Sequence, residues 1–183
     1  MDKKMKSKVR YITAAAVLLA ICIVSQLLKN LSVFITGPII NACLIIAVLT
    51  CGYFWGIVLS VLTPVTAFLI TGAPVMKAVP ALIPLIMAGN AVLVTVVWLF
   101  VRKKKKYLSV VISGVIGSLL KAGFMTLTIS YGVLTVVTLP EKLQAMLPVL
   151  QTTYSLTQLI TALIGTAYAC IIWLALRRVY ERD

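Results

Sequence analysis

Acidic and histidine side chains are scarce in this chain, and their absence removes several classes of function. The 183 residues include no histidine and only four acids, Asp2, Glu141, Glu181 and Asp183. All four acids lie outside the long apolar runs, so no carboxylate or imidazole can relay protons inside a membrane. Catalysis by paired carboxylates or by a serine–histidine pair is excluded there for the same reason. We therefore expect no enzyme, and no carrier that moves protons through its spans.

Metal and nucleotide chemistry also lack the residues they need. The four cysteines all lie inside apolar runs without C-x-x-C spacing: Cys22, Cys43, Cys51 and Cys170. With no histidine present, a zinc-type site is not expected, and the cysteines are interpreted as small apolar packing residues. No G-x-x-x-x-G-K-[ST] phosphate loop occurs, which excludes ATP hydrolysis by that route. We expect no metal and no cofactor.

Apolar residues are what the chain has in excess. They make up 62% of the sequence against 11% charged residues, and the mean hydropathy is +1.11. Soluble domains are nearer half apolar and a quarter charged, so the composition indicates a membrane protein. The net charge of +13 comes from short basic blocks beside apolar runs. That placement is typical of loops facing a negative membrane surface, and it argues against nucleic-acid binding.

Six apolar runs are long enough to cross a bilayer, which takes about 20 residues per helix. We predict an all-α fold, a polytopic transmembrane bundle of six helices forming one integral membrane domain over residues 1–183. The first run is too long for a signal peptide, so we expect it to stay uncleaved. The segment 138–152 is expected to be a partly helical loop. The predicted spans are about 11–29, 38–51, 54–71, 80–101, 107–137 and 153–176.

Lysine and arginine predict the orientation of these spans. Of the 17 basic residues, 13 lie in the N-terminal segment, in the loop 102–106 and at the C-terminus, on one face of a six-span topology. The positive-inside rule makes that face cytoplasmic, so both termini are expected in the cytoplasm of a protein of the cell (plasma) membrane. Tryptophan and tyrosine, which favour the membrane interface, are predicted at the same ends: Tyr11, Tyr53, Trp55, Trp98, Tyr107, Trp173 and Tyr180.

Polar side chains inside the spans gather in the outer half and at the midplane. This asymmetry predicts a polar cavity that opens outward and is closed on the cytoplasmic side by apolar packing. Each amide taken alone is equally well explained as a bond between helices. Gln26 lies late in the first span, and the residues predicted to contact a substrate are Asn41, Asn90, Lys121, Tyr131, Tyr154 and Gln158.

Lys121 is the most informative of these residues. A lysine at mid-membrane costs about 2.5–3.5 kcal/mol on insertion scales, and it lies roughly 20 Å along the helix from Tyr107, too far to reach the interface easily. No acid in any span can neutralise it. We therefore expect Lys121 to pair with an anionic group of the substrate, a carboxylate or a phosphate.

The chain resembles the substrate-binding S component of energy-coupling factor (ECF) transporters, the vitamin-uptake branch of the ABC transporters. The resemblance covers nearly the whole chain and rests on size, six spans, topology and a basic N-terminus before an alanine-rich first span. The similar elements are Ala16-x-x-x-Ala20, Gly37-Pro38-Ile39-Ile40-Asn41-Ala42, Gly56 to Pro64, and Ile83-Pro84 to Gly89-Asn90.

The resemblance implies a membrane subunit that binds a vitamin or related small molecule from outside with high affinity. A transmembrane T component and two ABC ATPases would then energise its import. It also implies that Ala16 and Ala20 dock the T component. The pocket would be built from spans four to six with the outer loops 30–37, 72–79 and 138–152. Riboflavin, pantothenate, folate-like compounds, niacin and biotin all stay open as substrates.

Two other classes of function remain open at this point. A self-sufficient small-solute carrier or channel would work without partner proteins, driven only by the gradient of its solute. A non-transporting membrane scaffold would bind no solute and would form a stable complex with a partner.

Overall fold

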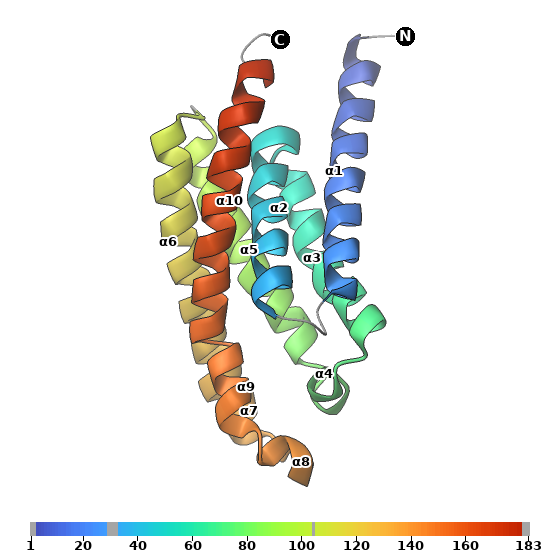
Figure 1. Cartoon of the computed structure of the whole chain (residues 1–183), viewed down its shortest axis with the longest axis vertical. Coiled ribbons are helices and arrows are strands. Elements are labelled where there is room, and N and C mark those ends of the chain that lie inside the picture. The colour runs from blue at the N-terminus through green and yellow to red at the C-terminus, as the bar shows by residue number, and fades with distance from the viewer. Residues whose placement is uncertain (1–2, 29–32, 104, 181–183) are drawn as a thin grey trace.

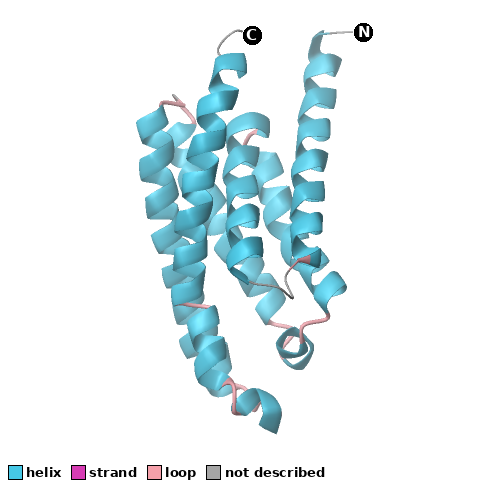
Figure 2. Ribbon diagram, in the orientation of Figure 1, coloured by secondary structure: helices cyan, strands magenta, loops and turns pink. Residues whose placement is uncertain are grey.

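The structure, a computed structural model, describes residues 3–28, 33–103 and 105–180. Within those ranges the chain is built from helices, with no strand (Figures 1 and 2). The long elements are α1 (Lys3–Leu27), α2 (Val33–Cys51), α3 (Tyr53–Thr71), α5 (Leu82–Val101), α6 (Tyr107–Met125) and α10 (Leu156–Tyr180). The short ones are α4 (Pro74–Ala78), the π-helix η1 (Thr126–Val133), α7 (Leu134–Val136), α8 (Glu141–Gln144) and α9 (Leu147–Thr153).

The prediction of an all-α bundle with six spans is confirmed. Six helical segments are long and apolar enough to cross a membrane: Lys8–Leu27, Val33–Cys51, Tyr53–Thr71, Leu82–Val101, Tyr107–Val136 and Leu147–Arg178. The N-terminal end of α1 and the C-terminal end of α10 lie at the same end of the bundle (Figure 1). The molecule therefore has the architecture of a multi-pass membrane protein with an even number of spans.

Several predicted boundaries shift by a few residues. Helix α2 begins at Val33, five residues before Pro38, because the apolar residues ahead of the proline continue the helix. Helix α10 runs past Arg178 to Tyr180, since arginine is a good helix former once its side chain reaches polar surroundings. Between α2 and α3, Gly52 has φ of 94°, a backbone conformation that glycine adopts at little cost.

Helix α2 forms the centre of the bundle. It packs against α1, α3, α5 and α10, and it is the most deeply buried of the spans. Helix α1 packs mainly on α2 and α3 and lies at the edge of the molecule (Figure 1). Most of its apolar side chains therefore face outward, as lipid or another apolar surface requires.

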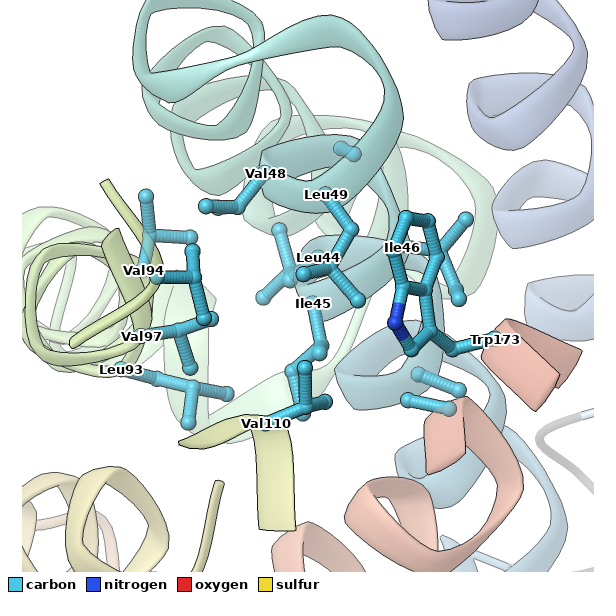
Figure 3. Close-up of a cluster of buried hydrophobic side chains, with 14 of the residues drawn as sticks. Leu44, Ile45, Ile46, Val48, Leu49, Leu93, Val94, Val97, Val110 and Trp173 are labelled. Carbon is cyan, nitrogen blue, oxygen red and sulfur yellow. The ribbon is translucent and has the colours of Figure 1, made fainter. Parts of the chain in front are cut away.

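An apolar core fills the half of the bundle nearest the termini. Leu44, Ile45 and Leu49 of α2 meet the valines of α5 and Val110 of α6, as Figure 3 shows. Trp173 of α10 is also part of this core, in the half that carries the termini, and is only 2% exposed. The expected apolar closure of this half is confirmed.

Small side chains let α6 and α10 approach closely. Gly114 faces Thr166, and a Cβ atom at Gly114 would overlap the threonine methyl group. One turn further along α6, Ser118 Oγ lies 3.2 Å from Thr166 Oγ1. Close backbone approach of this kind is typical of helix pairs in membranes.

The basic loop between α5 and α6 caps the neighbouring end of α2. Lys105 Nζ donates a hydrogen bond of 2.7 Å to the carbonyl oxygen of Leu49, one of the terminal helix carbonyls that lack a partner within the helix. Partial burial lowers the pKa of the Lys105 ammonium. The loop thus fixes the end of α2 that is opposite to the polar residues described next.

Candidate solute-binding cavity

A cavity of about 130 Å³ lies in the half of the bundle away from the termini. Each of the six spans contributes to its wall, together with α4. Polar lining comes from Gln26, Thr36, Asn41, Thr63, Asn90, Lys121, Thr153, Tyr154 and Gln158, and apolar lining from Val33, Ile40, Pro64, Ala67, Met76 and Ile86, with Gly37 between them. The sequence-based expectation of a polar cavity away from the basic end is therefore met by the fold.

Among the described residues, Lys121 is the only charged side chain of this lining, and it is 3% exposed. Its Nζ donates to Asn41 Oδ1 at 2.6 Å and to Asn90 Oδ1 at 2.8 Å. An ammonium group has three donors, so one N–H remains without a partner among the described residues. Glu141, the one acid in the described ranges, is exposed on α8 at the far tip of the molecule (Figure 1). The charge is solvated by amide dipoles but is not neutralised.

The two asparagines are themselves held by backbone and hydroxyl groups. Asn41 Nδ2 donates to the Gly37 carbonyl oxygen one turn earlier on α2 at 2.9 Å. Asn90 Nδ2 lies 3.5 Å from Thr63 Oγ1 of α3. Helix α10 supports Asn41 from behind, because a Cβ atom at Gly165 would lie 2.6 Å from Asn41 Cβ. The oxygens that bind Lys121 are thus preorganised by three neighbouring helices.

Gln26 extends this network to α1. Its Nε2 donates to the Thr63 carbonyl oxygen at 3.0 Å, so the polar chain runs from Lys121 through Asn90 and Thr63 to Gln26. The Gln26 side chain is 1% exposed, and its Oε1 atom is buried without a hydrogen-bond partner in the described part of the chain. A buried acceptor left without a donor costs roughly 1–3 kcal/mol, which marks this atom as a candidate contact for a ligand.

Tyr154 and Gln158 line the cavity where α9 joins α10. Tyr154 is 6% exposed, and Gln158 Nε2 lies 3.4 Å from the Thr153 carbonyl oxygen. The segment is anchored to η1 by a reciprocal pair of bonds, Ser130 Oγ to the Gln151 carbonyl at 2.9 Å and Gln151 Nε2 to the Ser130 carbonyl at 3.1 Å. The cavity wall therefore includes a short helix that is clamped rather than loose.

Tyr131 is not part of this site. Its side chain is 68% exposed and does not line the cavity, whereas the preceding Ser130 is buried. The residue lies in the π-helix η1, where i→i+5 hydrogen bonding changes the angle between successive side chains. The prediction rested on the depth of Tyr131 in the span, which does not determine the face of the helix on which its side chain lies.

The structure also shows where the predicted docking residues and outer loops lie. Ala16 and Ala20 lie on the exposed face of α1 and do not line the cavity. The pocket expected from spans four to six also involves α1, α2 and α3. Of the outer loops, 72–79 contributes Met76. The loop 138–152 ends immediately before the lining residues of α9, and residues 29–32 lie outside the described ranges.

The sequence analysis left two important lining residues, Thr63 and Gln26, out of the predicted site. The spans contain many hydroxyl residues, and the sequence does not distinguish Thr63 from them. Its backbone carbonyl oxygen accepts the hydrogen bond from Gln26, and no side-chain pattern predicts a contact of that kind. The adjacent Pro64 is the available signal, because a proline inside a span often marks a functional irregularity of the backbone. The sequence did identify Gln26 as a polar residue late in the first span, but it was not predicted to contact a substrate.

Comparison with known proteins yields no relative of this chain. No protein-family model matches it, and neither a curated protein nor a solved structure does. The assignment of function therefore rests on the chemistry of the cavity.

Proposed function

We propose that this chain is the substrate-binding S component of an ECF-type uptake system, which takes a vitamin or related small molecule from outside the cell. The observation that carries the proposal is the buried ammonium of Lys121, which faces a cavity in the membrane-spanning part and has no acid to neutralise it. An anionic group of the substrate is the missing partner, since buried charges in membranes are paired.

A purely structural role explains Lys121 poorly. Two amide oxygens can be satisfied by any neutral donor, and a buried charge without a counter-ion costs several kcal/mol of desolvation free energy. A structural polar network would therefore be more stable with glutamine or serine at this position. The empty space beside the ammonium group favours a guest molecule over a helix-to-helix bond.

The proposal includes partner proteins, because the chain has no phosphate loop of the P-loop type with which to use ATP. Helix α1 presents Ala16 and Ala20 on an outward face between exposed apolar residues such as Val17 and Val24. Small residues allow a second helix to approach closely in the bilayer. We assign this face to docking of a T component that is coupled to two ABC ATPases.

The orientation that belongs to this proposal is both termini in the cytoplasm of a plasma-membrane protein. Basic residues concentrate at the end that carries the termini, as the positive-inside rule requires of a cytoplasmic face. In that orientation the cavity lies in the outer half of the bilayer, where it can take up solute from the medium.

Substitution of Lys121 tests the binding site directly. In Lys121→Met, retention of a co-purifying small molecule is expected to fall at least 100-fold, because the anionic group loses its counter-ion. Lys142→Met is the matched control, since Lys142 is exposed outside the spans. Mass spectrometry of small molecules released from the detergent-purified proteins measures the effect. Equal retention by Lys121→Met and the wild type would remove the basis of the proposal.

Reconstitution tests the need for partners. Proteoliposomes with this chain alone are expected to bind solute without accumulating it, and accumulation requires the T component and ATPases. Ala16→Leu with Ala20→Leu should reduce uptake at least tenfold while leaving binding unchanged. Gly123→Leu is the control, since a Cβ atom there meets nothing within 4 Å. Uptake by the chain alone would favour a self-sufficient carrier, and no binding with a stable partner complex would favour a scaffold.

A further inference from the structure

The dimensions and chemistry of the cavity restrict the substrate class, on the basis of the proposed function. The cavity holds about 130 Å³. Sites for drug-sized ligands are several times larger, with volumes of about 300–1,000 Å³. A fused three-ring compound or a molecule with a long side chain is too large for this site.

The charge of the described lining favours a monoanion as the substrate. Among the described residues, Lys121 is the single lysine or arginine that lines the cavity. One ammonium group balances one negative charge, whereas a phosphate with nearly two charges would leave excess charge buried at a cost of several kcal/mol. The free N–H of Lys121 supplies one charge-assisted hydrogen bond of the kind a carboxylate accepts.

A second buried atom defines the other end of the ligand. Gln26 Oε1 accepts no hydrogen bond within the described ranges, although the same amide is fixed through its Nε2 atom to Thr63. Because Thr63 also contacts Asn90, and Asn90 binds Lys121, the acceptor and the ammonium group belong to one wall of the cavity. A substrate N–H or O–H group is the chemistry that satisfies this oxygen.

The opposite lining is apolar, with Ile40, Pro64, Met76 and Ile86. We propose that the substrate is a compact monocarboxylic acid with an apolar body and an amino or hydroxyl substituent. Its carboxylate binds Lys121 and its substituent donates a hydrogen bond to Gln26 Oε1. Among the substrates left open by the sequence, this chemistry disfavours riboflavin and folate-like compounds.

The test starts from an unbiased source of ligands. Purified wild-type protein in nanodiscs is incubated with the water-soluble small-molecule fraction of yeast extract, washed, denatured and analysed by mass spectrometry. The expected retained species is a compact monocarboxylic acid with an N–H or O–H group and without a fused three-ring system. Retention should fall at least 100-fold in Lys121→Met and about tenfold in Gln26→Met, which keeps the side-chain length but removes the acceptor.

A synthetic series isolates each feature of the ligand. The three aminobenzoates carry both groups, benzoate lacks the donor and the aminobenzamides lack the charge. At least one aminobenzoate is expected to bind tenfold more tightly than benzoate to the wild type, with no such advantage in Gln26→Met. Thermal unfolding of each variant verifies that it is folded.

Different failures separate this inference from the proposed function. A retained species that is neutral, cationic or as large as a three-ring compound overturns the inference and leaves the solute-binding role in place. Equal retention of the acid by Lys121→Met and the wild type overturns the inference as well. If the wild type retains no small molecule and binds no benzoate derivative, the proposed function and the inference both fail.

Discussion

The amide oxygens of Asn41 and Asn90 solvate the Lys121 ammonium, and this arrangement separates the stability of the protein from its binding function. Each asparagine uses its oxygen for the lysine, while the NH2 group of Asn41 donates within α2 and that of Asn90 points to Thr63 of α3. The asparagines therefore lower the cost of burying the ammonium group without neutralising its charge. A carboxylate in either position would cancel it.

Asn90→Asp tests this separation. The substitution keeps the size of the side chain and places a negative charge about 2.8 Å from Lys121 Nζ. The internal ion pair should preserve or raise the midpoint of thermal unfolding while reducing retention of an anionic ligand at least tenfold. Asn90→Leu is the companion variant and should lower the unfolding midpoint, since it leaves a buried donor unsatisfied at a cost of roughly 1–3 kcal/mol. Undiminished anion binding by Asn90→Asp would contradict the role given to Lys121.

At the scale of single residues, the sequence identifies the polar groups whose burial costs the most free energy and misses those whose burial costs little. Lys121, Asn41 and Asn90 stand out because their burial in lipid requires a reason, and the structure brings them together with Tyr154 and Gln158. Thr63 was missed because its contribution includes a backbone carbonyl. Tyr131 was misplaced because the prediction used only its depth in the span, which does not determine the direction of its side chain in the π-helix η1.

At the scale of elements, the contact between α2 and α10 determines the position of the cavity residue Asn41. Gly165 lies against α2, where an added Cβ atom would come within 2.7 Å of the Pro38 carbonyl oxygen and 2.6 Å of Asn41 Cβ. Backbone atoms cannot yield as a flexible side chain can. The two helices must therefore separate to admit any larger residue, and Asn41 would move with α2.

Gly165→Ala is expected to destabilise the fold by about 1–3 kcal/mol, the usual cost of overpacking, and to weaken ligand retention through displacement of Asn41. The measurement is thermal unfolding of the purified protein together with ligand retention by mass spectrometry. Gly123→Ala is the control, because its Cβ atom meets no neighbour within 4 Å, and it should be neutral or stabilising. An unfolding midpoint of Gly165→Ala equal to that of the wild type would show that α2 and α10 can separate freely.

The number and order of the helices are the features that the sequence predicted best. Lengths of apolar runs determine spans directly, because every backbone polar group in lipid must bond within its own helix. Helix ends are less certain from sequence, as the early start of α2 and the extension of α10 illustrate. The share of α1, α2 and α3 in the cavity depends on three-dimensional packing, which apolar periodicity does not encode.

The whole molecule is divided into two unlike halves. An apolar core near the termini contrasts with the polar cavity and its cap of short helices at the other end. Among the described residues, the basic ones near the terminal end outnumber those remote from it. This asymmetry is the basis of the orientation proposed for the protein.

Cysteine labelling tests the orientation. The native cysteines are all buried, so a membrane-impermeant maleimide should react with a newly introduced exposed cysteine alone. Lys142→Cys is expected to be labelled in intact cells, whereas Lys103→Cys should need permeabilised membranes. Labelling in the reverse order would place the cavity on the cytoplasmic side, and the chain would then no longer suit uptake from the medium.

The π-helix η1 has a consequence for how the chain could change over evolutionary time. A π-bulge is equivalent to one extra residue accommodated inside an α-helix. Loss of one residue between Thr126 and Val133 would restore an ordinary helix and remove the wide turn that holds Ser130. Ser130 would leave its clamp with Gln151, and the cap of the cavity would have to be rebuilt. A single-codon deletion here thus offers a short route to altered selectivity in descendants of this chain.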